Sequence, residues 1–213
     1  PGYALSVLQW SGIRDLPASL HSAYAQFRWM RRINPKLAID LAVSPGVFSD
    51  YEQGADEMLR IPGHGAVIWT LGPTAKLVGG VGRFDRLDVD LLPVGGLIWT
   101  PNDDTKFEIL FPKPKLARRI NWFGPCPGDV SDWFYLAGEF GGSTWAIRRA
   151  NGANDVLNYR DLRLILGVER KAIGMMDYRF EIGYVFGREL EYASATPKVE
   201  PSDTIMIRAG ATY

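Results

Sequence analysis

Apolar and polar residues alternate along much of this chain, most clearly over the last eleven residues, 203–213. A period of two places successive side chains on opposite faces of a strand. One face of this strand would carry Ile205, Ile207, Ala209, Ala211 and Tyr213, and the other Thr204, Met206, Arg208, Gly210 and Thr212. Alternation that ends on an aromatic last residue is typical of the closing strand of a bacterial outer-membrane β-barrel.

Two longer segments, 157–169 and 176–191, show the same period. In the first, Leu162, Leu164, Leu166 and Val168 oppose a charged face, and in the second the apolar row runs from Met176 through Phe180 to Phe186. A soluble sandwich or barrel would alternate in the same way, with its apolar side chains inward. The period therefore predicts strands without deciding whether the apolar face meets lipid or a protein core.

The whole pattern predicts thirteen strands in one domain, 1–213, because no linker or low-complexity tract interrupts it. They are expected over 1–10, 22–33, 36–48, 64–71, 75–84, 91–100, 104–111, 114–122, 132–141, 143–149, 157–169, 176–191 and 203–213. Turn residues separate them at Asn34-Pro35, Gly72-Pro73, Pro101 to Asp104, Pro112 to Pro114, Gly141-Gly142 and Gly152. The fold class predicted is an all-β, antiparallel transmembrane β-barrel of about 12–14 strands. Since bacterial barrels close with an even number, we expect a strand to be missing upstream of Pro1.

The order of the turns predicts a topology. With the C-terminus in the periplasm, 123–131, 150–156 and 192–202 lie outside the cell, and 112–114, 141–142 and 170–175 lie in the periplasm. The long stretch 49–63 then falls on the periplasmic side, against the usual preference for short turns there.

Aromatic residues and glycines favour a membrane barrel over a soluble sheet. Aromatics lie along one face or near strand ends, as interface girdles do; they are Phe27, Trp29, Trp69, Trp99, Phe107, Phe111, Trp122, Trp133, Trp145, Tyr178 and Tyr192. Glycines interrupt strands at 79, 80, 82, 95, 96, 167, 183 and 187, which suits a strongly coiled barrel wall. Core aromatics of a sandwich and bulges of an ordinary twisted sheet are the alternative explanations.

If lipid lies outside, the charged faces turn into the lumen. The lumen-facing residues predicted on this basis are Arg28, Asp40, Glu108, Lys115, Arg119, Glu139, Asp161, Arg163, Glu169, Arg179, Glu181 and Arg208, and continued alternation adds Glu189. Their signs are mixed, which is typical of ion-paired filling of a narrow barrel, whereas wide selective pores often segregate charge. We interpret these residues first as structural and second as a solute pathway.

Composition limits the partners and the chemistry. Lys plus Arg and Asp plus Glu number 24 each, so net charge gives no reason to expect nucleic acid. The single cysteine, Cys126, lies among Gly and Pro residues and is interpreted as a loop thiol. No apolar run is long enough for a membrane helix, so membrane residence would be through strands. The chain starts without the pattern of an export signal, which we expect to have been removed or to lie outside this sequence.

Enzymatic readings find little support. His21 and His64 are the only histidines and neither has a metal-ligand spacing, so no metal and no cofactor is predicted. Ser22 is the serine nearest to His21, but adjacent strand residues point to opposite faces. Carboxylate pairs such as Asp103-Asp104 look like a turn rather than an acid and base.

Several blocks carry a resemblance to known proteins: Leu91 to Asp104, Phe107 to Lys115, Gly138 to Gly142, Asn158 to Asp161, Gly183 to Arg188 and Glu191 to Ser194. From about residue 17 onward, the chain resembles a family of outer-membrane β-barrel proteins found chiefly in planctomycete bacteria. The resemblance implies an outer-membrane location and a barrel fold, with further strands before the part that corresponds to Pro1. The family has no assigned activity, so the resemblance transfers no catalytic residue.

Three functions remain open from the sequence. The first is an integral outer-membrane barrel, porin-like or structural, whose partners are outer-membrane lipid, the barrel-assembly machinery and other envelope proteins. The second is a soluble β-sandwich or β-barrel binding module, and the third is an outer-membrane enzyme.

Overall fold

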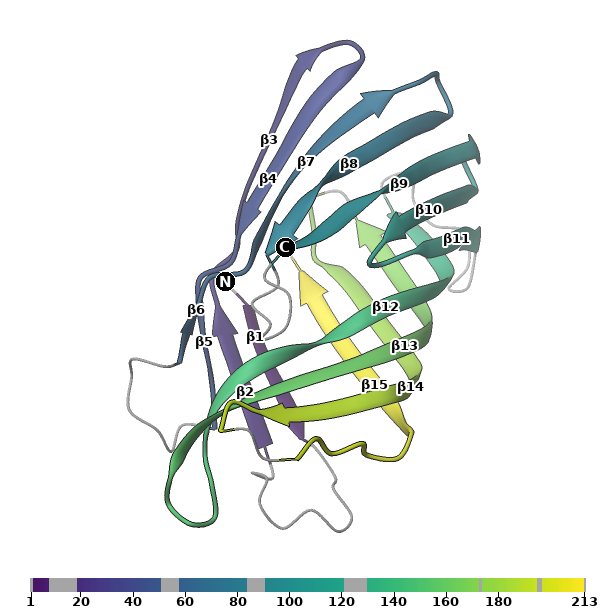
Figure 1. Ribbon diagram of the computed structural model, residues 1–213. Helices are drawn as coiled ribbons and strands as arrows, with labels where there is room; N and C mark the ends of the chain where they lie inside the picture. The colour runs from purple at the N-terminus through teal and green to yellow at the C-terminus, as the bar shows by residue number, and fades with distance from the viewer. Residues whose placement is uncertain are drawn as a thin grey trace.

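The computed structural model describes residues 2–7, 19–50, 58–83, 91–120, 130–172, 174–194 and 197–212, and this part of the chain is all-β, as the alternation predicted. The strands (Figure 1) are β1 (Gly2–Val7), β2 (Ser19–Tyr24), β3 (Phe27–Asn34), β4 (Leu37–Val43), β5 (Gly46–Ser49), β6 (Leu59–Arg60), β7 (Gly63–Thr70), β8 (Ala75–Arg83), β9 (Leu91–Asn102), β10 (Thr105–Phe111), β11 (Lys115–Ile120), β12 (Val130–Arg148), β13 (Asn154–Ala172), β14 (Asp177–Tyr192) and β15 (Thr204–Thr212).

Three pairs of these strands are continuous segments with short breaks. The β2–β5 and β3–β4 ladders share one register, and so do β5–β6 and β4–β7. Hydrogen bonds carry the ladders across the breaks: Ala25 N–H donates to Pro45 O (3.0 Å), and Ser44 N–H to Pro62 O (2.8 Å). Proline has no N–H for a ladder, which accounts for breaks at these positions. Counting β2 with β3, β4 with β5 and β6 with β7 leaves twelve antiparallel segments.

The predicted turn at Gly141-Gly142 is wrong. Both glycines lie inside β12, which pairs with β13 over nineteen consecutive residues without a bulge. Gly142 has φ +111, a conformation that glycine adopts without steric cost, so the strand passes through it. The two predicted strands 132–141 and 143–149 are therefore one, and the odd count of thirteen becomes twelve.

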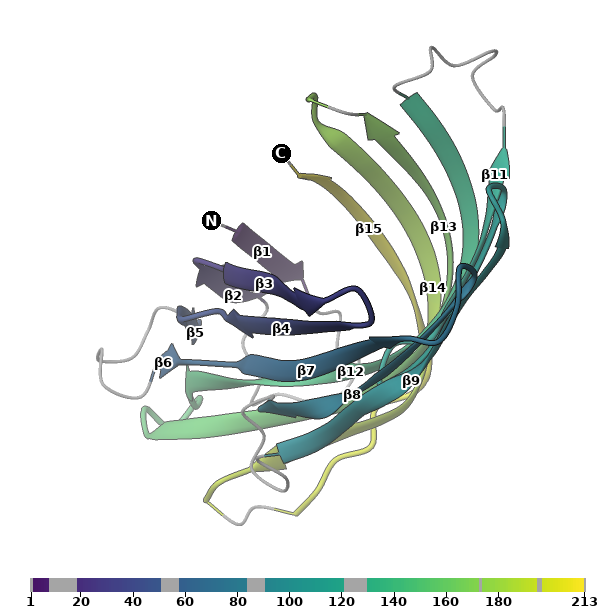
Figure 2. The ribbon, with the colours of Figure 1, turned by 90° about the horizontal axis from the view of Figure 1, so that it is seen from above.

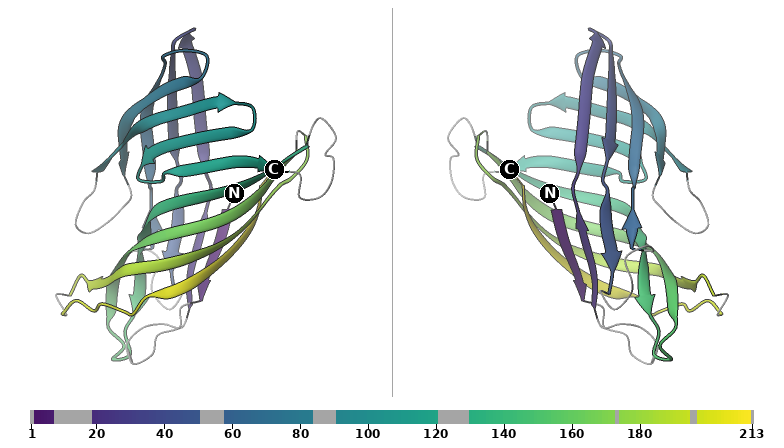
Figure 3. Two further views of the ribbon diagram at one scale, coloured as in Figure 1. Left: turned by 90° about the vertical axis from the view of Figure 1, so that its right-hand side faces the viewer. Right: turned by 90° about the vertical axis from the view of Figure 1, so that its left-hand side faces the viewer.

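The segments form a meander that curls into a deep trough (Figures 1 and 2). Each segment pairs with its neighbours in sequence, from β1 on one edge to β15 on the other. Figure 3 shows the two chain ends close together. Among the described residues β1 pairs only with β2 and β15 only with β14, so the sheet is open between these edges.

The two faces of the sheet differ sharply in character. We call the face inside the curl the inner face and the opposite one the outer face. On the outer face Leu164 and Phe180 are each 51% exposed and Ile207 is 69% exposed. On the inner face Glu181, which neighbours Phe180 in β14, is only 3% exposed. A sandwich with its apolar side chains at the centre would show the reverse arrangement.

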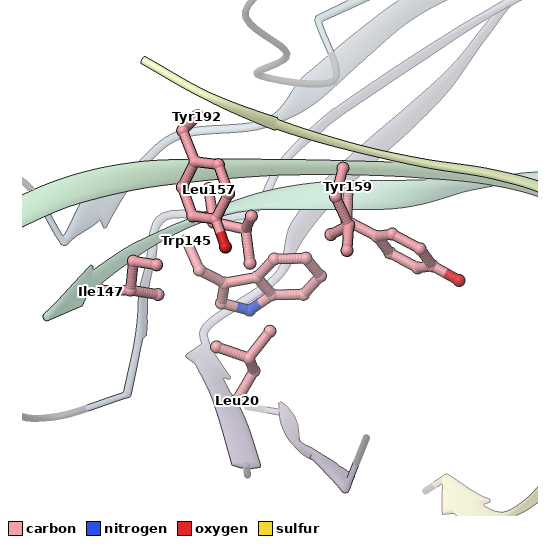
Figure 4. Close-up of a cluster of buried hydrophobic side chains, with 7 residues drawn as sticks. Leu20, Trp145, Ile147, Leu157, Tyr159 and Tyr192 are labelled. Atoms are coloured by element: carbon pink, nitrogen blue, oxygen red, sulfur yellow. The ribbon is translucent and has the colours of Figure 1, made fainter. Parts of the chain in front are cut away.

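One end of the inner face carries the largest apolar cluster. This end cluster (Figure 4) consists of Leu20, Trp145, Ile147, Leu157, Tyr159, Leu190 and Tyr192, with Phe48 and Val199 packed against it. It joins opposite sides of the curl. The indole Nε1 of Trp145 donates to Ser22 Oγ at 3.2 Å, and Ala146 forms a single parallel bridge with Ser49.

The predicted girdle role is wrong for three of the aromatics. Trp145 and Tyr192 are buried in the end cluster, and Trp133 lies on the inner face, so the core explanation holds for them. Trp122, the terminal Tyr213 and the loop thiol Cys126 lie outside the described residues.

The predicted lumen-facing position of Glu189 is also wrong, because a bulge precedes it. Gly187 has φ +57, and the β13–β14 register shifts at this point. One extra residue in a strand exchanges its faces. Beyond the bulge Leu190 and Tyr192 point inward, whereas Glu189 pairs with Arg160 on the outer side.

Candidate functional site

All twelve charged residues predicted for the lumen lie at inner-face register positions. The register connects them in rows across the sheet: one row runs from Lys115 through Ala137 to Ile165, and the next from Tyr135 through Gly167 to Glu181. Ten of the twelve gather on β10 to β15, and Arg28 and Asp40 lie on β3 and β4. The strands thus bring most of them to one wall.

Glu139 of β12 is the carboxylate on that wall with three cationic neighbours. Lys113 Nζ lies 2.8 Å from its carboxylate, Arg208 Nη2 3.2 Å and Arg163 Nη1 3.9 Å. Arg163 also donates through Nε and Nη2 to Asp161, at 2.8 and 2.9 Å. A bidentate contact of this kind fixes both side chains.

Glu181 and Glu169 extend the network. Glu181 accepts hydrogen bonds from Tyr135 (2.5 Å) and Arg208, and Arg179 Nε lies 3.6 Å away. Glu169 accepts from Lys115 (2.5 Å) and from Lys171 (2.8 Å). Arg208 therefore links Glu181 to Glu139.

Two glycines make room for these side chains. A Cβ at Gly141 would overlap Asp161 and Arg163, and one at Gly167 would overlap the Tyr135 ring. Both glycines are the direct cross-strand partners of residues in the network. The mid-strand glycines on this wall are thus positions where a longer neighbour lies across the backbone.

A second, smaller cluster lies on the opposite wall. Arg28 donates through Nε and Nη2 to the two carboxylate oxygens of Asp40, at 2.8 and 2.7 Å. His64 Nε2 lies 3.5 Å from Asp40 Oδ2. The predicted residues Glu108 and Arg119 join neither cluster: Glu108 pairs with Lys106, and Arg119 lies over the Trp133 ring at 5.2 Å.

The carboxylates lie at the base of these clusters and the cations above them. The side chain of Glu139 is 10% exposed and that of its partner Lys113 62%; the side chain of Glu181 is 4% exposed and that of Arg179 49%. Asp40 and Arg28 show the same order. The surface that the inner face presents is therefore cationic.

Sequence reasoning missed several members of these clusters. Tyr135 and Lys171 occupy inner-face positions that the alternation could have supplied, but Lys113 lies in the turn between β10 and β11, where a period of two gives no information. His64 was considered as a catalytic residue, not as a partner of Asp40.

The described residues contain no group of three or more His, Cys, Asp or Glu arranged to hold a metal ion. Ser22 and His21 are consecutive in β2, and Ser22 is bound to Trp145 inside the curl. No helix in the described part of the chain is sufficiently long and apolar to span a bilayer.

Comparison with known proteins gave no match. No family model fits the chain, and neither the curated proteins nor the solved structures include one with significant similarity. The likeness to the planctomycete outer-membrane family thus stays a prediction from the sequence.

Proposed function

We propose that this chain is an integral outer-membrane β-barrel protein whose interior is held by ion pairs and closed at one end, with a structural role in the envelope. The observation that carries the proposal is a band of exposed apolar residues around the outer face. On the described strands it includes Trp29, Leu41, Val67, Trp69, Leu77, Trp99, Ile109, Leu136, Leu164, Phe180 and Ile207. In water so large an apolar surface would drive association, whereas lipid is its natural solvent.

The height of the band fits a bilayer. On β13 the outer positions from Leu162 to Val168 are apolar, and ionic pairs flank them: Arg160 with Glu189 on one side, and Arg170 with Asp132 on the other. Arg160 and Arg170 are ten residues apart, or about 33 Å along the strand and about 25 Å along the normal at a tilt of about 40°. Outer-membrane barrels have apolar bands about 25 Å tall.

Most loop lengths support one orientation, with 121–129 as the exception, and in it 121–129 and 112–114 lie on the sides opposite to those predicted from the sequence. With twelve segments and the C-terminus in the periplasm, the periplasmic connections are 35–36, 71–74, 103–104, 121–129 and 173–176. The outer ones are 8–18, 50–58, 84–90, 112–114, 149–153 and 193–203. The stretch between β5 and β6 now falls outside, as expected, because the false turn at Gly141-Gly142 had reversed every strand before it. Long loops outside and short turns inside are usual for such barrels.

The end cluster favours a closed interior over an open pore. It lies at the long-loop end and connects β2 and β5 to β12, β13 and β14. Asp50 strengthens the connection, because its N–H donates to Ala146 O (3.3 Å) and its carboxylate accepts from Arg148 N–H (2.8 Å). Side chains packed across the inside at that end support a closed interior rather than an aqueous path.

Tryptophan fluorescence in lipid vesicles tests the membrane placement. Trp29, Trp69 and Trp99 are 50%, 54% and 42% exposed on the outer face. We expect lipids brominated on their acyl chains to quench this emission strongly, and replacement of the three by Phe to remove most of the quenching. The proposal is contradicted if the protein stays in the supernatant with vesicles present, or if brominated lipids do not quench its emission.

Planar-bilayer recording tests the closed interior separately. The folded protein is expected to give no stepwise conductance at rest. If protein that also shows bromine quenching gives steady single-channel steps, the barrel part of the proposal stands and the structural role is replaced by a porin-like one.

A further inference from the structure

The inner face becomes cationic toward the end opposite the end cluster. Six Lys or Arg residues occupy inner register positions within three residues of a connection at this end, five beside a short turn and Arg119 beside 121–129. We call them the mouth cations: Arg32, Lys76, Lys106, Arg119, Lys171 and Arg179. They come from β3, β8, β10, β11, β13 and β14, so they are distributed around the curl.

The acids at this end are fewer, and apart from Asp103 in the turn between β9 and β10 each has a described partner. Glu108 and Glu169 are bound to Lys106 and Lys171 at 2.5 and 2.8 Å. Asp177 accepts the N–H of Ala172 at 2.9 Å, and Asp104 in its turn lies 3.9 Å from Arg119.

Arg32 and Lys76 supply the surplus positive charge. Both are exposed, and neither has an ion-pair partner among the described residues. They lie on the wall opposite Lys171 and Arg179. A space bordered by cations on both walls attracts anions, and the attraction is stronger where the walls exclude water.

We propose that the short-turn end is a vestibule that draws in and holds small carboxylate- or phosphate-bearing anions. This rests on the proposed function, because a barrel is what would bring the two walls to face each other. Charged rings of Lys and Arg serve this purpose in anion-selective pores. Here the end cluster stops the path, so anions enter and leave through the same mouth.

Trp133 is a reporter inside this vestibule. Its ring is half-buried on the inner face beneath Arg119, and its Nε1 donates to Ser131 Oγ at 3.0 Å. Its emission is isolated as the difference between the protein and its Trp133→Phe variant, both in vesicles. Iodide, caesium and acrylamide then probe the same ring with a negative, a positive and a neutral quencher.

We expect iodide to quench Trp133 more than caesium does after each is scaled to acrylamide, and high salt or inorganic phosphate to reduce the difference. Arg32→Gln with Lys76→Gln should reduce iodide quenching by up to about twofold at low ionic strength. This is the effect in water of two unit charges about 20 Å away, since β8 and β12 are four strand spacings of about 4.8 Å apart along the sheet. Neither substitution removes an ion pair between described residues, so folding should be unaffected.

The matched control neutralises two cations of the outer face near the same end, Arg31→Gln with Arg118→Gln. It changes net charge equally and should leave iodide quenching of Trp133 unchanged. Equal quenching by iodide and caesium in the parent protein, or an equal loss in both double variants, overturns the vestibule. Bromine quenching of Trp69 and Trp99 in the same samples shows independently whether the barrel sits in lipid.

Discussion

At Leu164 the expected cost of a charged substitution differs strongly between a face in lipid and a face in water. It lies on the outer face of β13, half exposed, between Gly138 of β12 and Tyr184 of β14. It is four residues from Arg160 and six from Arg170, near the middle of the apolar band. Leu164→Arg should therefore cost about 2–4 kcal/mol of folding free energy, the cost of arginine at the midplane of a membrane barrel.

The same substitution in a soluble protein would be almost neutral. A half-exposed surface position away from caps and cores usually tolerates replacement within about 0.5 kcal/mol. Ile33→Arg is the matched control, because Ile33 is equally exposed but lies at the register shift in β3, next to the short turn that follows this strand. Near the interface the cost should fall to about 0–1 kcal/mol.

Equilibrium unfolding by guanidinium in phospholipid vesicles measures both costs, with tryptophan emission as the signal and linear extrapolation to water. The expected result is a large loss for Leu164→Arg and a small one for Ile33→Arg. If both variants stay within about 0.5 kcal/mol of the parent, the outer face does not meet lipid and the assignment of the two faces to lipid and lumen fails.

Three further predictions concern the inner face. Gly167→Ala should cost about 1–3 kcal/mol in the same unfolding assay, because the added Cβ displaces the buried Tyr135 hydroxyl from its acceptor. In the control Gly79→Ala the added Cβ meets nothing within 4 Å, so the free energy of unfolding should change by under about 0.5 kcal/mol. Glu139→Gln removes the charge shared by three cations and should cost up to about 3–5 kcal/mol if the interior is dry; a value near zero would indicate a wet lumen. Trp145→Ala should cost about 3–5 kcal/mol or loosen the end cluster enough to give transient conductance in a planar bilayer, and a stable, silent variant would contradict its closing role.

The sequence predicted the strands and their two faces where alternation was uninterrupted. From Leu162 to Val168 and from Tyr178 to Tyr184 every residue lies on the face expected from a period of two. The ionic partners could not be predicted in the same way. Which cation reaches Glu139 depends on how three strands are staggered, and stagger is a property of the folded sheet.

Glycine caused both errors of strand assignment, for opposite reasons. Gly141-Gly142 looks like a turn, yet these residues keep the strand straight through a crowded place where Asp161 crosses. Gly187 looks like an ordinary strand residue, yet it forms the bulge that exchanges the faces beyond it. Composition cannot separate these cases, because the first depends on the side chain that lies across the glycine and the second on a positive φ at a bulge.

The length of the β12–β13 hairpin places parts of this chain in different solvents. Nineteen residues span about 63 Å along the strand, or about 48 Å along the normal at a tilt of about 40°, which exceeds the roughly 30 Å of a hydrocarbon core. The outer register positions become polar at Thr144 and Asn158, which are buried and hydrogen-bonded to each other where the end cluster begins. This end would then lie above the headgroups and be stable in an aqueous environment, whereas the wall below depends on contact with the acyl chains. Denaturant should unfold the two parts in separate steps, and the free energy that reports the cost of Leu164→Arg is that of the step in which the wall unfolds.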